Sequence, residues 1–179
     1  MSTQSPDDPV LIEHARRDPE AFAVLYRRYL VPVYRYLYRR LDNVHDSEDL
    51  TAQVFMDALE DLARGRFQSG GNFAAWLFTI ARHRIADFYR RKPAAVLDEL
   101  PSGEAGLLAA VEKADDLKHL ARLLSQLDTE KQELLRLRFS GGLGFAEIAL
   151  LEGKSEAAVK MNIYRAIDWL RDHWEAENE

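Results

Sequence analysis

The fold of this chain is decided by the stretch GGLGFAEIALLEGKSEAAVKMNIYRAIDWLR at residues 141–171. Its apolar residues recur at intervals of three and four positions on both sides of Gly153, which is the spacing of two amphipathic helices. We predict a short helix over residues 145–151, a turn over residues 152–154 and a long helix that follows an N-cap at Ser155. A tight turn with a glycine between two helices is typical of the DNA-binding helix-turn-helix, although an ordinary packed helix hairpin fits the same pattern.

Upstream of this motif, apolar residues recur at helical spacing in three longer segments, over residues 22–41, 50–62 and 73–88. Polar and acidic residues at 46–49 precede the second segment and predict its N-terminus there. The loop RGRFQSGGN at residues 64–72 contains three glycines and separates the second segment from the third. We expect these three helices to pack as one bundle.

Between residues 93 and 116 the composition changes, with two prolines, two glycines and six acids against one base. This composition predicts a flexible linker that becomes helical at its end. Helical periodicity resumes at Leu117. The predicted fold class is therefore all-α, with two small helical domains at residues 1–92 and 117–179, of which the second carries the helix-turn-helix.

The composition limits the classes of function. The 179 residues include no cysteine, which excludes disulfides, thiolate zinc sites and thiol catalysis, and the net charge of −6 excludes a uniformly basic nucleic-acid coat. No apolar run approaches the roughly 18 residues of a membrane span, and the N-terminus lacks the pattern of a secretory signal. We expect a soluble, cytoplasmic protein.

Two neighbouring segments carry opposite charge. Residues 42–62 contain seven acids and no Lys or Arg, and a helix of this kind repels phosphate and attracts a basic partner. Residues 73–92 contain five Lys or Arg and one acid, interleaved with aromatic residues. A helical wheel places Phe78, Arg82 and Tyr89 opposite the apolar side of this segment, which suits stacking on unpaired bases. The same residues would also suit packing against another helix beside a solvated arginine face.

No residue cluster indicates catalysis. The five histidines form no His-x-x-x-His or His-Glu-x-x-His pair, and no phosphate-binding or dinucleotide-binding glycine loop is present. His45 beside its acidic neighbours and His83 with Asp87 are common surface arrangements. We therefore predict a binding protein rather than an enzyme, with no catalytic residues, metal or cofactor.

Four stretches in this order resemble the extracytoplasmic-function (ECF) sigma factors of bacterial RNA polymerase: AFAVLYRRYLVPVYRYLYRRL, DSEDLTAQVFMDAL, FAAWLFTIARHRIADFYRRK and LLRLRFSGGLGFAEIALLEGKSEAAVKMNIYRAIDWLR. The resemblance implies a protein that binds core RNA polymerase and directs promoter-specific transcription initiation. It implies that residues 1–92 are sigma region 2, which binds core polymerase and recognises and melts the −10 element. Residues 117–179 would be sigma region 4, which reads the −35 element.

By position, the resemblance assigns three groups of residues. The polymerase-binding group is Asp46, Glu48, Asp49, Gln53 and Phe55. The −10 DNA-binding group is Gln68, Ser69, Asn72, Phe78, Arg82, His83, Tyr89, Arg90 and Arg91. The −35 DNA-binding group is Ser155, Lys160, Met161, Asn162, Tyr164 and Arg165.

The chain departs from the family pattern at two places. His83 stands where the family commonly has Asn, which changes the hydrogen-bonding set offered to a base. Ala157-Ala158-Val159-Lys160-Met161 replaces a family run that contains two hydroxyl residues, so the promoter sequence is not predicted. The family also implies an anti-sigma factor as a partner. The alternative hypothesis is a free-standing helix-turn-helix regulator whose N-terminal helices sense a ligand or dimerise.

Overall fold

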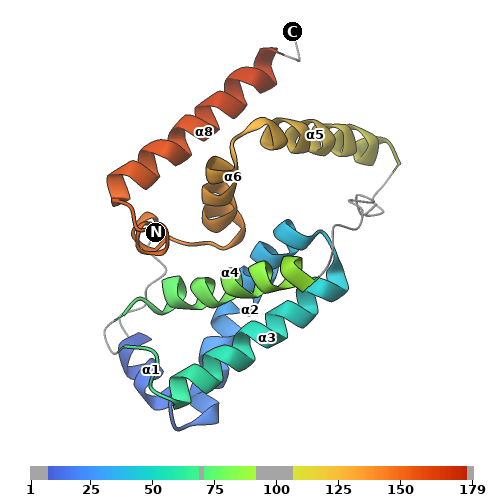
Figure 1. The fold of residues 1–179 in the computed structure, drawn as a ribbon. Helices are drawn as coiled ribbons and strands as arrows, with labels where there is room; N and C mark the ends of the chain where they lie inside the picture. Colours follow the sequence, from blue (N-terminus) through green and yellow to red (C-terminus); the bar gives the residue numbers. More distant parts are fainter. Residues whose placement is uncertain (1–7, 69–70, 92–106, 177–179) are drawn as a thin grey trace.

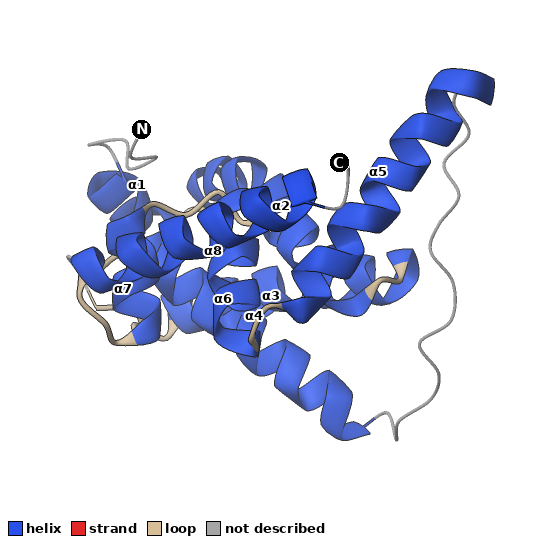
Figure 2. Cartoon of the chain, turned by 90° about the horizontal axis from the view of Figure 1, so that it is seen from above, coloured by secondary structure: helices blue, strands red, loops and turns tan. Residues whose placement is uncertain are grey.

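The computed structural model describes residues 8–68, 71–91 and 107–176, and the regular structure of these residues is entirely helical (Figure 1, Figure 2). The elements are α1 (Asp8–Ala15), α2 (Pro19–Leu41), α3 (Val44–Ala63), α4 (Phe73–Arg91), α5 (Leu107–Gln126), α6 (Thr129–Leu135), the π-helical turn η1 (Arg136–Ser140), α7 (Phe145–Glu152) and α8 (Glu156–Ala176). The predicted all-α fold class is confirmed.

Helices α2, α3 and α4 form the predicted bundle, and α1 adds to it. Leu25, Val33 and Val54 are fully buried among these helices. Helix α3 begins earlier than predicted, because the Oδ1 atom of Asn43 accepts a hydrogen bond of 3.0 Å from the backbone N–H of Asp46. Helix α1 was not predicted, since its eight residues are too few to show a clear apolar period.

Helix α5 begins at Leu107, inside the segment predicted as a linker, and residues 92–106 lie outside the described part of the chain. The periodic leucines at the start of the predicted helix do not all face the core. Leu117 is 64% exposed and Leu120 is also exposed, whereas Leu123 is fully buried. The buried face of α5 is therefore narrower than the sequence period indicated.

The helix-turn-helix is confirmed in its details. Helix α7 ends at Glu152 and is capped by Gly153, whose φ of +63° is the left-handed conformation that favours glycine. The Oγ atom of Ser155 accepts a hydrogen bond from the backbone N–H of Ala158, which caps the start of α8. Val159 and Ile163 are buried on the inner side of α8, as predicted.

The two helical domains share one core. Buried apolar residues of both domains form a continuous cluster. Helix α4 contacts α7, and α2 contacts η1, so that α2 and α4 together face the C-terminal domain (Figure 1). A carbon atom added as a Cβ at Gly141 would lie 2.7 Å from the Cε1 atom of Phe78, which shows how closely the domains approach.

Candidate protein and nucleic-acid interfaces

The N-terminal half of α3 presents an acidic surface, which we define as Asp46, Glu48, Asp49 and Gln53. Glu48, Asp49 and Gln53 are exposed and Asp46 is half-buried. Within the described residues, Glu48 and Asp49 have no ion-pair partner. Because no Lys or Arg of the described residues pairs with Glu48 or Asp49, this surface contributes a local negative field.

The C-terminal half of α3 differs, because arginines neutralise its carboxylates. Asp57 forms two hydrogen bonds with Arg84 of α4, and these bonds raise the pKa of the Arg84 guanidinium. Asp61 pairs with Arg66 at 2.8 Å, and Glu60 pairs with Arg64 at 2.5 Å. The expectation that α3 is uncompensated along its whole length was wrong, since these bases come from outside residues 42–62.

Phe55 does not belong to the acidic surface. Its side chain is 4% exposed, and its ring packs edge-on against Tyr26 of α2 with 4.8 Å between ring centres. Phe55 faces α2, and its assignment to the polymerase-binding group, which follows from the resemblance alone, stays a prediction. Met56, 70% exposed, is a large apolar side chain that α3 presents instead, and the sequence analysis did not select it.

The outer part of α4 and the loop before it keep most of the predicted −10 residues accessible. Gln68, His83, Arg90 and Arg91 are exposed, although Arg90 pairs with Asp87. Tyr89 is exposed as predicted and its hydroxyl donates to the backbone carbonyl of Arg40 at 2.6 Å. Ser69 lies outside the described residues.

Asn72 has a structural contact that the sequence analysis did not predict. Its Oδ1 atom accepts a hydrogen bond of 2.8 Å from the backbone N–H of Ala75. Asn72 therefore caps the N-terminus of α4, since this bond satisfies a donor that the helix itself leaves free. Its side-chain carbonyl is occupied by that bond.

Phe78 is buried and Arg82 is half-buried beside the C-terminal domain, so for Phe78 the structure agrees with the alternative of packing against another helix. Phe78 is 0% exposed, and its ring packs against Tyr36 with 5.2 Å between centres. The Nη1 atom of Arg82 lies 2.8 Å from the Oε1 atom of Glu152, at the end of α7. Phe78 lies between Tyr36 of α2 and Gly141 of the C-terminal domain and belongs to the core that the two domains share, whereas Arg82 lies at its edge. That side of α4 is an interface between domains.

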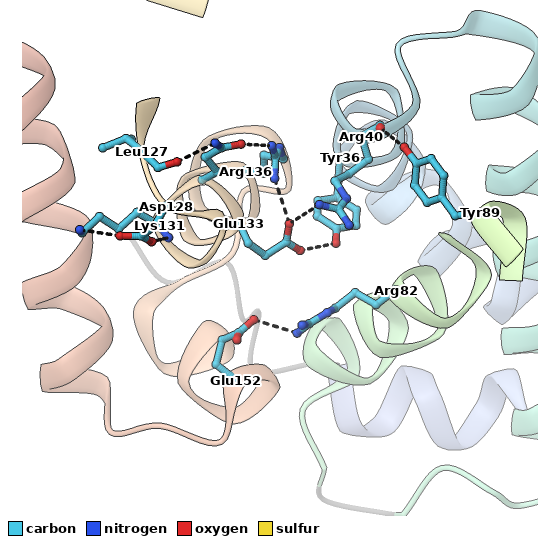
Figure 3. A network of polar contacts seen from close by, with 11 residues as sticks. Tyr36, Arg40, Arg82, Tyr89, Leu127, Asp128, Lys131, Glu133, Arg136 and Glu152 are labelled. Atoms are coloured by element: carbon cyan, nitrogen blue, oxygen red, sulfur yellow. Dashed lines mark hydrogen bonds and ion pairs between the residues drawn. The ribbon is translucent and has the colours of Figure 1, made fainter. Parts of the chain in front are cut away.

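A polar network continues this interface (Figure 3). The Tyr36 hydroxyl donates to Oε1 of Glu133 at 2.5 Å, while Nη1 of Arg40 lies 3.5 Å from Oε2 of the same carboxylate. Burial, and then the Glu133 carboxylate, raise the pKa of Tyr36, so its hydroxyl stays protonated. A cleft of about 410 Å³ adjoins the network and is lined by Arg82 and Tyr89 among others. The sequence analysis missed Tyr36 and Glu133, since no local pattern links residues so far apart.

The outward side of α8 is open. Lys160, Met161, Tyr164 and Arg165 are exposed, and the Nζ atom of Lys160 lies 5.9 Å from the centre of the Tyr164 ring. The two remaining members of the predicted −35 group are Ser155 and Asn162. Ser155 is the N-cap of α8 described above. These side chains present a basic and aromatic surface at the start of the second helix of a helix-turn-helix, which is the part that enters a major groove in proteins of this kind.

Glu130 of α6 contacts two polar side chains at the edge of the α8 surface. The Nδ2 atom of Asn162 donates to its Oε1 atom at 3.3 Å, and Nζ of Lys154 lies 2.5 Å from the same atom. One of the two amide N–H donors of Asn162 is thus engaged inside the C-terminal domain.

Neither a metal site nor a membrane span is found in the described part of the chain. Within residues 8–68, 71–91 and 107–176, no three His, Asp or Glu side chains cluster in a way that could hold a metal ion. None of the described helices combines the length and the apolar character needed to cross a bilayer.

Two family models match the chain in succession. The model described as Sigma-70 region 2 matches residues 25–94, and the model described as Sigma-70, region 4 matches residues 117–170. The first covers α2 to α4, with the acidic surface and the basic helix. The second covers the C-terminal half of α5, then α6 and α7, and most of α8.

Curated relatives are sigma factors. The chain is 36% identical to the ECF RNA polymerase sigma factor BldN of Streptomyces coelicolor over 166 residues, which cover 88% of this chain and 62% of BldN. The chain thus spans less than two thirds of the length of BldN. It is 30% identical to the ECF RNA polymerase sigma factor SigD of Mycobacterium tuberculosis over 175 residues, covering 92% of this chain and 82% of SigD.

Solved structures share the fold. CnrH, solved in complex with the cytosolic domain of CnrY, matches with a TM-score of 0.69 and 25% identity over 94% of this chain and 97% of CnrH. The sigma factor RpoE of Bartonella quintana, solved with the anti-sigma factor NepR, matches with a TM-score of 0.62 and 20% identity over 87% of this chain and 98% of RpoE.

Proposed function

The chain belongs to the family of ECF RNA polymerase sigma factors, and from that premise we propose that it binds core RNA polymerase and directs promoter-specific transcription initiation. The observation that carries the proposal is the succession of regions 2 and 4 in one chain. Each region has a charged surface suited to its task. A free-standing regulator is not favoured, because region 2 would then have no partner. Because the curated relatives are sigma factors, we propose that this chain has no catalytic activity of its own. We also propose that it acts in the cytoplasm.

The acidic surface of α3 is proposed as the contact with core polymerase. Glu48 and Asp49 are exposed carboxylates without an internal partner among the described residues. A basic surface on the polymerase would gain by pairing with them, and complementary charge raises the association rate as well as the specificity. The neutralised half of α3, around Asp57, is not part of this proposal.

The outer side of α4 is proposed to hold the opened −10 element. Tyr89 offers a ring for stacking, His83 offers donors and acceptors, and Arg90 and Arg91 offer charge for the DNA backbone. Extrusion of a base from the stack costs a few kcal/mol, and stacking on an aromatic ring returns roughly 1–3 kcal/mol. Gln68, Ser69 and Asn72 stay as predicted members of this site, at the loop before α4.

The outward side of α8 is proposed to read the −35 element in the major groove. Lys160 and Arg165 can contact guanine or phosphate, and Asn162 can contact adenine once its bond to Glu130 is exchanged. Because the structure of RpoE contains an anti-sigma factor, we extend the proposal to an anti-sigma factor as a partner of this chain as well.

The proposal is tested by charge reversal on the acidic surface. The variant Asp46→Lys/Glu48→Lys/Asp49→Lys should bind core polymerase at least about tenfold more weakly, because attraction becomes repulsion. Its affinity for duplex DNA should not fall, since α8 is untouched. The matched control is Asp168→Lys/Asp172→Lys/Glu175→Lys, which reverses three exposed acids at the other end of the chain.

Two outcomes would contradict the proposal. Equal loss of core binding in the test and control variants would show that overall charge, and not this surface, governs the interaction. A wild-type chain that neither binds core polymerase nor supports promoter-specific transcription with it would exclude the sigma-factor function itself.

A further inference from the structure

Helix α2 is basic, a feature that the sequence analysis did not single out. It contains five arginines and one acid, Glu20, which lies in its first turn. Helices α1, α3 and α4 and the turn η1 pack against α2. The remaining side of α2 carries three exposed arginines, which are Arg27, Arg35 and Arg39. We call these three residues the arginine row of α2.

The arginine row has no carboxylate partner in the described part of the chain. Neither an ion pair nor a hydrogen bond joins any of its three side chains to another described residue. Arg64 and Arg66 are also exposed, but they pair with Glu60 and Asp61. A guanidinium without an internal partner keeps its fork of N–H donors for a carboxylate or a phosphate. On a chain with a net charge of −6, this row is a local positive field that suits an anionic partner.

Two tyrosines accompany the arginine row. At helical spacing, Tyr34 and Tyr38 share a side of α2 with Arg27, and their rings stack with 6.0 Å between centres. Among the described residues, neither hydroxyl has a hydrogen-bond partner. Arginine and tyrosine side chains both donate to phosphate oxygens in protein–DNA interfaces. The row extends about 18 Å along the helix axis at about 1.5 Å per residue, which matches about five phosphates of one DNA strand.

The arginine row ends beside the C-terminus of α4. The Tyr89 hydroxyl donates to the backbone carbonyl of Arg40 at 2.6 Å, and Arg40 directly follows Arg39 in the chain. The last turn of α4 carries Arg90 and Arg91, which are exposed and belong to the surface proposed for the −10 element. A DNA backbone bound at this end of α4 therefore comes close to the row. This continuity favours DNA over an acidic protein as the occupant.

We propose that the arginine row of α2 binds the phosphate backbone of the duplex DNA that adjoins the −10 element. The proposal rests on the proposed function, since the row continues the surface assigned to that element. Contacts to phosphate position a protein on DNA without reading its sequence. The row therefore adds affinity and fixes the path of the duplex, while the choice of promoter stays with α4 and α8.

The experiment measures DNA binding by the full chain without polymerase, at several salt concentrations. The probe is a fluorescein-labelled duplex with a thymine-rich single-stranded end. The test variant Arg35→Gln/Arg39→Gln should bind it at least about threefold more weakly than the control variant, because two phosphate contacts are lost. The slope of log affinity against log salt should become shallower by up to about 1.8, which is about 0.9 for each contact. The control Lys118→Gln/Arg171→Gln removes the same charge from exposed cations that pair with acids of the C-terminal domain.

A conservative variant distinguishes a phosphate contact from a structural effect. Arg35→Lys/Arg39→Lys should keep the salt slope of the wild type, because counterion release depends on the charge that meets the phosphate. A slope that falls as far in the lysine variant as in the glutamine variant would show that the substitutions act on the fold, and would overturn the proposal.

Three further outcomes would overturn it. The first is a glutamine variant whose affinity and salt slope equal those of the control. The second is a wild-type chain that does not bind the probe at low salt. The third is a glutamine variant that loses affinity for core polymerase and keeps its affinity for DNA, which would make an acidic protein surface the occupant of the row.

Transcription assays separate this proposal from the proposed function. If the wild type supports promoter-specific transcription with core polymerase, while the glutamine variant and the control bind the probe alike, only the role of the arginine row is wrong. If the wild type neither binds core polymerase nor supports transcription, the sigma-factor function fails, whatever the probe shows.

Discussion

Helices α4 and α8 were both predicted to contact DNA, yet the structure leaves them in different states. The outward side of α8 is exposed, with Lys160 and Arg165 in solvent. On α4, the outer residues are exposed, but Phe78 is fully buried and Arg82 is half-buried and paired with Glu152 of the C-terminal domain. A helical wheel shows which side of a helix faces away from its own bundle. Whether that side is free for a partner depends on the other domain.

The aromatic residues of the two helices show this difference. Phe78 of α4 is fully buried, whereas Tyr164 of α8 is 48% exposed. The comparison is strongest where the two helices differ most, which is in the burial of their aromatic residues.

The largest expected effect is on stability, at Phe78. Phe78→Ala should lower the free energy of unfolding by about 3–5 kcal/mol, because it removes a fully buried ring and leaves a cavity between α2, α4 and η1. The matched control is Phe139→Ala, since Phe139 is 64% exposed on η1 and its loss should change stability by no more than about 0.5 kcal/mol. Urea unfolding monitored by circular dichroism gives both values.

A small effect of Phe78→Ala, close to that of Phe139→Ala, would show that the ring is exposed in solution. The contrast between α4 and α8 would then disappear, and α4 would offer its inner side to DNA in the free chain.

The next effect concerns DNA binding by α8. Lys160→Ala and Arg165→Ala should each weaken binding to a −35 duplex, by about 1–3 kcal/mol where a base contact is lost. A residue that contacts only phosphate should weaken specific and non-specific duplexes alike and reduce the salt dependence. The control Arg171→Ala removes an equal charge about 16 Å further along the helix axis than Lys160, given a rise of about 1.5 Å per residue. If Lys160→Ala or Arg165→Ala binds the −35 duplex as strongly as Arg171→Ala does, the substituted residue does not contact the DNA.

The sequence predicted the helix-turn-helix because its determinants are local. Gly153 permits the left-handed turn, Ser155 caps the next helix, and Val159 and Ile163 share a face at helical spacing. The turn, the cap and the buried face each depend on residues that lie within a few positions of one another in the sequence. The same reasoning predicted the three N-terminal helices within a few residues of their observed ends.

The sequence did not predict the contacts that join distant segments. Tyr36 and Glu133 are 97 positions apart, and nothing near either residue indicates that they meet. The aromatic side chain of Phe78 suits base stacking as well as core packing. Its close approach to Gly141 in the structure shows that it packs in the core, and no sequence pattern reveals that approach. The same limit applies to α3, where Asp57 has no base at helical spacing but finds Arg84 on the neighbouring helix. Local periodicity carries no information on such partners.

The smallest expected effect is at Glu130, which engages Lys154 and Asn162 beside the α8 surface. Glu130→Gln should raise the affinity for non-specific duplex DNA by no more than about threefold, because a solvent-exposed ion pair contributes less than about 1 kcal/mol. If the released Lys154 contacts a phosphate, the slope of log affinity against log salt should steepen by up to about 0.9. The control Glu156→Gln removes the same charge from an exposed position at the start of α8. If the salt slope changes equally in Glu130→Gln and Glu156→Gln, Glu130 affects DNA binding only through its charge. Its contacts with Lys154 and Asn162 would then place no restraint on DNA binding by α8.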